Sequence, residues 1–369
     1  MSTKLRIAYL AHSVRSDWNN GNAHFLRGLL RAMVSLGHTV RILEPKQNWS
    51  MNNLADEPNG PRSLETFSTL YPDLKVQIYS ESADHDTWTD LLQQTDIVIL
   101  HEWNPPKLAQ TLLHLRAQLG FKLLFHDTHH RATSSPEAIR SFGIDHFDGV
   151  LAFGNVLRDL YRSAFGLENV WTLHEAADTT LFKPQPSSTT EQDVVWIGNW
   201  GDEERSSELR EFLLTPAAAR RDLRFTIFGV RYPPNGLDAL QQAGIRYGGY
   251  LPNLDAPATY ARSRLTIHVP RRQYATTMVG IPTIRVFEAL ACGIPLLSAP
   301  WQDTEHLFRP GDLTFVQTGN AMSSAMDRLL ADPSRAQAQA AQGLETILAR
   351  HTCNHRATEL TEICKEVLQ

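Results

Sequence analysis

The stretch His268-Val-Pro-Arg-Arg-Gln-Tyr-Ala-Thr-Thr-Met-Val-Gly-Ile-Pro-Thr-Ile-Arg-Val-Phe-Glu-Ala-Leu-Ala-Cys-Gly-Ile-Pro295 says most about the fold. The apolar run Leu265–Val269 predicts a strand that ends as this stretch begins. Further on, the pattern predicts a helix over Ile284–Ala291, with Thr283 as its N-cap and Gly293 and Pro295 as its stop signals. A strand, a loop and a helix in this order are typical of a parallel α/β sheet.

The same stretch predicts an anion site. A helix over Ile284–Ala291 would direct free backbone N–H groups and a positive dipole end toward the strand end, where a diphosphate fits. Arg271 follows the strand directly and could add charge-assisted hydrogen bonds. Glu288, one turn inside the helix, could accept from a ribose diol beside the phosphates. The alternative is an ordinary helix with a surface i,i+3 pair of Arg285 and Glu288, and the residues alone favour neither interpretation.

Outward from this stretch, short apolar runs alternate with helical patterns along most of the chain. A polar, proline-containing segment over Lys183–Thr190 separates two such series and is typical of a linker. We therefore predict an α/β fold of two doubly wound, Rossmann-like domains facing an interdomain cleft. The expected limits are 1–183, 184–345 and a C-terminal helical segment, 346–369, that crosses back onto the first domain. The expected buried strands of the first domain include Val76–Tyr79, Asp96–Leu100, Lys122–Phe125, Gly149–Ala152 and Val170–Leu173.

Length and charge narrow the class of protein. The chain has 369 residues, which predicts two domains at about 150 residues each. Its formal net charge of −5 argues against general nucleic-acid binding, which needs a basic surface. Three cysteines cannot form a disulfide framework without one left over, so we expect a reducing cytoplasm. No apolar run reaches the roughly 18 residues of a membrane span, which leaves only contact with a membrane surface open.

Several common site motifs are absent from the sequence. It contains no G-x-G-x-x-G, no P-loop, no G-x-S-x-G and no H-E-x-x-H motif, which argues against the corresponding oxidoreductases, nucleotidases and hydrolases. Asp84 and Asp86 could hold a divalent cation, but an acid at a helix start is the better interpretation. His351, Cys353 and His355 lack a fourth ligand nearby in the sequence. We expect neither a metal nor a cofactor.

The residues Glu288-Ala-Leu-Ala-Cys-Gly-Ile-Pro295 resemble the donor-site helix of retaining GT-B glycosyltransferases, which reads E-A-x-A-C/S-G-x-P. Downstream, Trp301-Gln-Asp303, Leu307–Gly311 and Ala349–Arg356 are similar to the branch of spore-maturation-type glycosyltransferases. The resemblance implies a metal-independent enzyme that takes a nucleotide diphosphate-sugar as co-substrate, with Glu288 as the ribose ligand. The acceptor is a glycan, lipid, protein or small molecule that the sequence does not identify.

One departure from the family pattern concerns the donor sugar. The usual pattern has a second glutamate eight residues before the ribose glutamate, and Gly280 stands there in this chain. Any sugar contact of the missing glutamate must come from elsewhere, for example from the backbone or from Arg285. Retention is therefore implied less firmly than the fold.

Other expected site residues follow strand ends. On the donor side, Gly198 and Asn199 end a predicted strand, and Arg205 is a substitute for the usual phosphate-binding arginine, or else a solvated partner of Glu203 or Glu204. By similarity, Tyr250 and Leu251 lie where the base is held. In the first half, similar enzymes place a catalytic histidine in the His126–Arg131 loop. Our candidates there are His129 and His130, with Glu102 as a base if the reaction inverts. The expected acceptor-binding residues are Ser13, Asn20, Gly21, His101 and Trp103.

Two other functions remain open from the sequence. A GT-B-type epimerase or phosphorylase would use the same donor helix without a carbohydrate acceptor. A non-catalytic nucleotide-sugar-binding protein would explain why Gly280 replaces a glutamate.

Overall fold

The computed structural model describes residues 4–80 and 82–369, and the chain divides into two compact units. Unit 1 comprises Met1–Glu175 and Cys353–Gln369, and unit 2 comprises Ala176–Thr352. The chain therefore changes unit at 175/176 and at 352/353. The sequence analysis put these two limits at 183/184 and 345/346, so each differs by seven or eight residues from the division in the structure.

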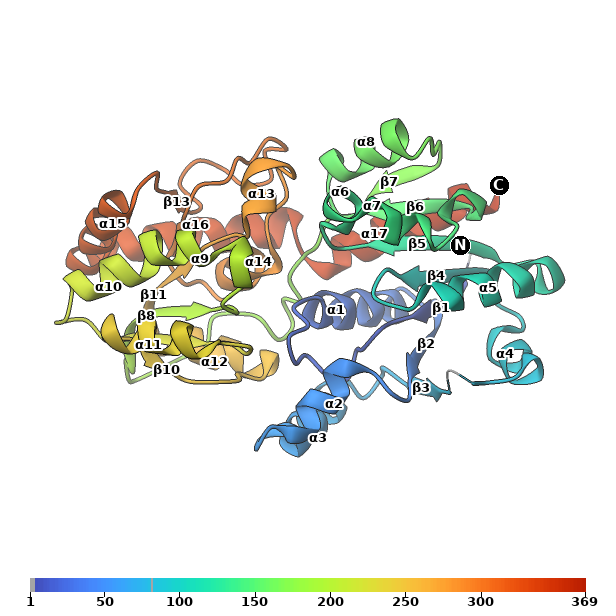
Figure 1. Ribbon diagram of the computed structural model, residues 1–369, viewed down its shortest axis with the longest axis horizontal. Coiled ribbons are helices and arrows are strands. Elements are labelled where there is room, and N and C mark those ends of the chain that lie inside the picture. The colour runs from blue at the N-terminus through green and yellow to red at the C-terminus, as the bar shows by residue number, and fades with distance from the viewer. Residues whose placement is uncertain (1–3, 81) are drawn as a thin grey trace. The chain divides into compact units, whose positions relative to one another are not determined.

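Unit 1 is built on a parallel sheet in the order β3-β2-β1-β4-β5-β6-β7 (Figure 1). The central strands are buried and rich in Val, Ile and Leu, as expected for a parallel sheet covered by helices. In register, Ala8 of β1 lies opposite Arg41 of β2 and Val98 of β4. The strands are β1 (Arg6–Leu10), β2 (Thr39–Pro45), β3 (Val76–Tyr79), β4 (Ile97–His101), β5 (Lys122–Asp127), β6 (Gly149–Ala152) and β7 (Val170–Thr172).

Helices cover this sheet, and one of them comes from the end of the chain. Helix α17 (Cys353–Leu368) packs on α1 (Asn22–Ser35), and His38 Nε2 lies 3.0 Å from Thr361 Oγ1 between them. Trp171 Nε1 also donates to Glu366 Oε2 at 3.0 Å. The remaining helices of unit 1 are α2 (Trp49–Asp56), α3 (Gly60–Leu70), α4 (His85–Leu92), α5 (Pro106–Leu119), α6 (Arg131–Ser134), α7 (Pro136–Arg140), the 3-10 turn η1 (Ile144–His146) and α8 (Asn155–Ala164).

Unit 2 repeats the plan with a parallel sheet in the order β10-β9-β8-β11-β12-β13. Its strands are β8 (Gln192–Ile197), β9 (Phe225–Phe228), β10 (Arg246–Tyr247), β11 (Ser263–His268), β12 (Leu296–Ser298) and β13 (Thr314–Phe315). The helices and turns are η2 (Asp202–Glu204), α9 (Ser206–Leu209), η3 (Arg210–Leu214, π-helical), α10 (Thr215–Ala219), α11 (Pro234–Gln242), η4 (Asn253–Asp255), α12 (Ala256–Ala261), α13 (Arg272–Thr276), α14 (Ile284–Ala291), α15 (Gly319–Ala331) and α16 (Pro333–Arg350).

The two doubly wound sheets confirm the predicted fold class. Helix α14 has the predicted bounds, and β11 ends one residue before the predicted Val269. One expectation is wrong: β3 forms as predicted but is not buried, because it is an edge strand whose Ile78 is 43% exposed. No helix in the described part of the chain is long and apolar enough to span a membrane.

Candidate functional site

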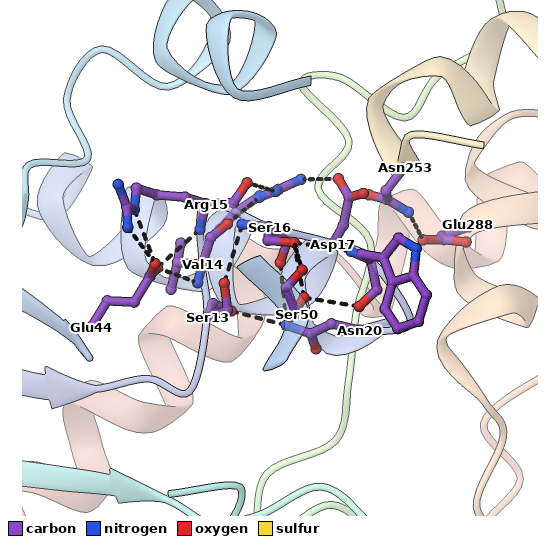
Figure 2. A network of polar contacts seen from close by, with 12 residues as sticks. Ser13, Val14, Arg15, Ser16, Asp17, Asn20, Glu44, Ser50, Asn253 and Glu288 are labelled. Atoms are coloured by element: carbon purple, nitrogen blue, oxygen red, sulfur yellow. Dashed lines mark hydrogen bonds and ion pairs between the residues drawn. The ribbon is translucent and has the colours of Figure 1, made fainter. Parts of the chain in front are cut away.

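Glu288 is the centre of the candidate site in unit 2. Its side chain is fully buried in α14, where Oε2 is ion-paired with Arg285. Oε1 accepts a 2.7 Å hydrogen bond from Asn253 Nδ2 (Figure 2). The interpretation of Arg285 and Glu288 as a surface pair is therefore wrong. A buried carboxylate is retained only where donors surround it, which makes this pair unlike an ordinary helix contact.

Asn253 is a member of this site that sequence reasoning missed. It is buried in η4, and its Oδ1 has no hydrogen-bond partner among the described residues. Only its place after Tyr250 and Leu251 could have suggested a role. Both of those residues are half-buried in the loop before η4, next to Asn253 in the chain. An unpartnered buried oxygen beside a buried carboxylate is a pair of acceptors for a diol.

The N-terminus of α14 is linked to the ends of two strands. Thr283 takes the predicted N-cap position with extended backbone, but its side chain does not cap the helix. Its Oγ1 instead lies 3.1 Å from Nε2 of His268, whose Nδ1 is 2.9 Å from Ser298 Oγ. Burial lowers the pKa of His268 to about 3, so the ring is neutral at physiological pH. The histidine therefore joins α14 to the last residues of β11 and β12.

Arginines gather around this helix end. Arg205 donates to the carbonyls of Asn199 (2.7 Å) and Val269 (3.2 Å), so its side chain is anchored at the strand ends. The charge of Glu204 also acts on this guanidinium. Its buried Nε has no hydrogen-bond partner in residues 4–80 and 82–369. Burial, together with the charges of Arg271 and Arg285, lowers the pKa of Arg205 to about 10.

The other predicted donor residues take structural contacts at the same strand ends. Arg271, the residue predicted to bind phosphate, is ion-paired with Glu204. Asn199 Oδ1 accepts from the Val230 backbone at 2.9 Å, and the Gly198 carbonyl accepts from Tyr232 at 2.8 Å. These bonds hold the end of β8 in place.

Gly280 has a conformation that explains why no glutamate stands there. Its φ is +97°, a region that residues with a β-carbon adopt only with strain. A β-carbon at this position would overlap Thr304 Oγ1. The departure from the family pattern is therefore built into the backbone of this loop.

In unit 1, two buried acidic residues lie at the carboxyl ends of neighbouring strands: Glu102 directly follows β4, and Asp127 is the last residue of β5. Glu102 is fully buried and ion-paired with Arg131, another residue that the sequence did not single out. Burial and the charge of Asp127 raise the pKa of Glu102 to about 8. Burial raises the pKa of Asp127 to about 6, and its Oδ2 accepts from Tyr161 at 2.5 Å.

One of these acids, Asp127, holds the backbone of a predicted histidine. The backbone N–H of His129 donates to Asp127 Oδ1 at 3.0 Å, and its ring contacts Trp103 edge-on at 5.0 Å. His130 is buried, and the centre of its ring lies 4.0 Å from the centre of the His129 ring. The Nδ1 atom of His130 is 2.9 Å from Ser134 Oγ.

Two predicted neighbours, His101 and Trp103, are placed differently from each other. His101 is only 1% exposed, and its Nε2 lies 3.0 Å from Thr128 Oγ1. It therefore packs against the His126–Arg131 loop from the interior of unit 1. Trp103 is half-buried beneath the Arg131 guanidinium, which lies 4.4 Å from the ring centre.

The loop after β1 is held by its own polar contacts (Figure 2). Ser13 Oγ accepts from Ser16 N at 3.2 Å, and Asn20 Nδ2 donates to the Ser13 carbonyl at 2.9 Å. Gly21 has ordinary helical backbone angles, so the expected close approach to a ligand does not depend on glycine's conformational freedom there. These three predicted acceptor residues thus lie in one ordered loop.

Two buried charges extend this network beyond what the sequence suggested. Glu44 at the end of β2 accepts from the backbone N–H groups of Val14 (2.8 Å) and Arg15 (3.1 Å). Arg27 of α1, which is fully buried, donates to the Val14 and Arg15 carbonyls and to Asp17. The pairing of residues so far apart in the chain has no local sequence signal.

The acidic and cysteine-containing motifs have structural roles. Asp84 caps α4 by accepting from Thr87 N at 2.9 Å, as its first-turn position indicated. His351 Nε2 lies 2.8 Å from the Leu307 carbonyl. No group of three metal-ligating side chains forms within the described ranges.

Part of the chain is similar to a known protein family. Residues 205–362 match the family described as "Glycosyl transferase-like", a segment that includes Glu288, Asn253 and Arg271. No curated protein matches the chain. The second half of the chain is thus similar to a glycosyltransferase family over this segment.

Solved structures resemble the whole chain. HepE of Anabaena, in complex with UDP and glucose, has a TM-score of 0.71 at 13% identity over 97% of this chain and 98% of that one. An alpha-glucosyltransferase in complex with UDP and a 13-mer DNA has a TM-score of 0.70 at 10% identity, covering 98% and 100%. A glycosyltransferase from Rickettsia africae has a TM-score of 0.68 at 12% identity, covering 100% and 99%. The chain therefore has the GT-B fold, as predicted.

Proposed function

We propose that this chain, which has the GT-B fold and is similar to a glycosyltransferase family over residues 205–362, transfers a sugar from a nucleotide diphosphate-sugar to an acceptor. We further propose that it does so in the cytoplasm, with retention of configuration and without a metal ion. The observation that carries the proposal is the buried Glu288, held by Arg285 and Asn253 one turn inside α14. The carboxylate and the unpartnered Asn253 Oδ1 supply the acceptors that a ribose diol requires.

The diphosphate would lie at the N-terminus of α14. The backbone N–H groups of a helix start and the nearby guanidinium groups of Arg205, Arg271 and Arg285 are suited to a doubly charged leaving group. Arg205 Nε is a buried donor that a phosphate oxygen would satisfy. Positive charge fixed in this way would stabilise the departing diphosphate in place of a divalent cation.

Unit 1 would bind the acceptor and supply the catalytic histidine. His129 is half-buried, and its backbone is held by Asp127, so its ring has a defined position at the end of β5. Trp103 beside it offers an aromatic surface. Glu102 is a weaker candidate for a base, because it is buried and ion-paired with Arg131.

Thermal unfolding with UDP, GDP, ADP, CDP and TDP, each with and without Mg²⁺, tests the donor site. A ligand at about 100 times its Kd stabilises the fold by roughly 2.7 kcal/mol, which is readily measured. UDP is the first candidate, since the HepE and alpha-glucosyltransferase structures contain it. We expect one clear responder that does not depend on Mg²⁺. No response to any of the five would refute the donor site.

Product analysis with the responding nucleotide-sugar tests the reaction. Transfer to an acceptor from a glycan or glycolipid panel, or slow donor hydrolysis, is expected to continue in the presence of a chelator. NMR of the product's anomeric proton reports retention or inversion. An isomerised or phosphorolysed sugar would identify an epimerase or phosphorylase, and binding without any turnover would identify a non-catalytic binding protein.

A further inference from the structure

A carboxylate from the loop after β8 is bound to one of the arginines of the candidate phosphate site. Glu204 is the last residue of the 3-10 turn η2, and its Oε2 is ion-paired with Arg271, the residue before α13. Its Oε1 accepts a 3.0 Å hydrogen bond from Gln273 Nε2 of α13. Both oxygens of this carboxylate are therefore held by residues that follow β11.

This carboxylate lies among several positive charges. The charges of Arg271 and Arg285 lower the pKa of the buried Arg205, and the charge of Glu204 raises it. Arg205 also donates to the Val269 carbonyl at 3.2 Å, in the connection between β11 and α13 that carries Arg271. Guanidinium groups held close together repel one another unless negative charge lies among them. Glu204 supplies such a charge from within the chain.

A diphosphate at the start of α14 would need the same donor that Glu204 holds. The side chains of Arg271 and Glu204 are 31% and 30% exposed, and an ion pair of this exposure is held far less tightly than a buried one. A phosphate can accept two parallel hydrogen bonds from a guanidinium. If Glu204 stayed in place, it would lie beside the phosphate as a like charge.

We propose that Glu204 is an internal competitor of the diphosphate, which holds Arg271 in the free chain and is displaced from it when a nucleoside diphosphate binds. The inference rests on the proposed function, because it needs the diphosphate at the start of α14. Binding then exchanges one anion for another on Arg271. The affinity for the diphosphate is therefore lower than the arginines alone would give, and the nucleoside diphosphate left after transfer is released more readily.

Calorimetry with the full chain tests this exchange. The Kd of UDP, or of the responding diphosphate in the panel, is measured in wild type, Glu204→Gln and Glu204→Ala. Both variants keep Arg271 and lose the competing charge. Breaking a partly exposed ion pair changes an affinity by up to about fivefold, and the loss of repulsion adds to this. We therefore expect both variants to bind UDP about threefold to tenfold more tightly than wild type does.

Glu208→Gln is the matched control. Glu208 pairs at 2.9 Å with Arg272, the residue after Arg271, so the change removes an equal charge from the neighbouring ion pair. Arg272 is not one of the arginines proposed to bind the diphosphate, and the affinity for UDP should stay within about twofold of wild type.

The possible results separate this inference from the proposed function. If Glu204→Gln and Glu204→Ala bind UDP no more tightly than wild type, the competitor role is overturned and the proposed function stands. An equal gain in Glu208→Gln would show a general effect of net charge and would also overturn it. If wild type binds no nucleoside diphosphate, the proposed function itself fails, and the inference fails with it. Urea unfolding of each variant checks that unit 2 remains folded.

Discussion

The Glu288 carboxylate has one oxygen bonded to Asn253 and the other paired with Arg285, all within unit 2. Glu288→Gln keeps the size of the side chain but removes the negative charge that is proposed to accept from the ribose diol together with Asn253 Oδ1. We expect nucleoside diphosphate affinity to fall by about tenfold or more, measured by calorimetry. Glu345→Gln, at a side chain 70% exposed and paired with Arg309, is the control and should bind as wild type does. Unchanged affinity in Glu288→Gln would remove its ribose role.

Gly280 permits a second test at a single residue. Gly280→Ala should destabilise unit 2 by more than the roughly 1–2 kcal/mol expected for an L-residue at positive φ, because its methyl group would also overlap Thr304. Gly249→Ala is the matched control: φ is +70° there, and a β-carbon would meet nothing within 4 Å. Urea unfolding measures both. Equal losses would show that the contact with Thr304 relaxes without cost.

Some site residues could be predicted from the sequence, and others could not. Glu288 was predicted because it belongs to a local motif, and Thr283 because helix starts have local signals. Asn253 and Arg131 were missed because each meets its partner through the fold, 35 and 29 residues away in the chain. Pairing over such distances leaves no trace in spacing or periodicity. The role assigned to every site residue, predicted or missed, stays a prediction.

Among the structural elements, the connection between β1 and α1 contains a buried ion pair. Arg27 and Asp17 form an ion pair whose side chains are 0% and 1% exposed. Arg27→Met should therefore destabilise unit 1 by about 3–5 kcal/mol, because it leaves Asp17 buried without its cation. In contrast, Arg6→Met breaks a pair whose side chains are 50% and 22% exposed, and should reduce the stability far less. Chemical unfolding compares the two, and similar losses would contradict the structural role of Arg27.

The elements themselves were largely predictable. Parallel strands are continuous apolar runs, so β4, β5, β6 and β11 could be found within one or two residues of their ends. The burial of β3 was misjudged because an edge strand and a central strand can share the same short pattern. Which strand lies at the edge depends on the order of pairing in the sheet, which short patterns do not encode.

At the scale of the whole molecule, buried neutral histidines occur in both units. Burial lowers the pKa of His12 to about 4 and that of His126 and His268 to about 3. Below the ordinary value near 6.5, the unfolded chain takes up protons that the folded chain does not. These histidines therefore stabilise the fold above about pH 6.5, and this contribution decreases as the pH falls toward 4.

His12→Gln isolates one of these contributions. Between about pH 6 and pH 4.5 the free energy of unfolding of the variant should decrease by about 1 kcal/mol less per pH unit than that of wild type. His146→Gln is the control, because a side chain 72% exposed has nearly the same surroundings before and after unfolding. Urea unfolding at three pH values measures the slopes, and parallel slopes for wild type and His12→Gln would contradict the prediction.

The discontinuity of unit 1 has a consequence during synthesis. Unit 2 is one uninterrupted segment, whereas unit 1 needs Cys353–Gln369 to supply the helix that packs on α1. At about 5–20 residues per second, a ribosome takes roughly 10–35 s to make the segment between the two parts of unit 1. Until α17 has been synthesised, the side of α1 that it covers is exposed to solvent on the nascent chain. Unit 1 is thus begun before unit 2 and completed after it.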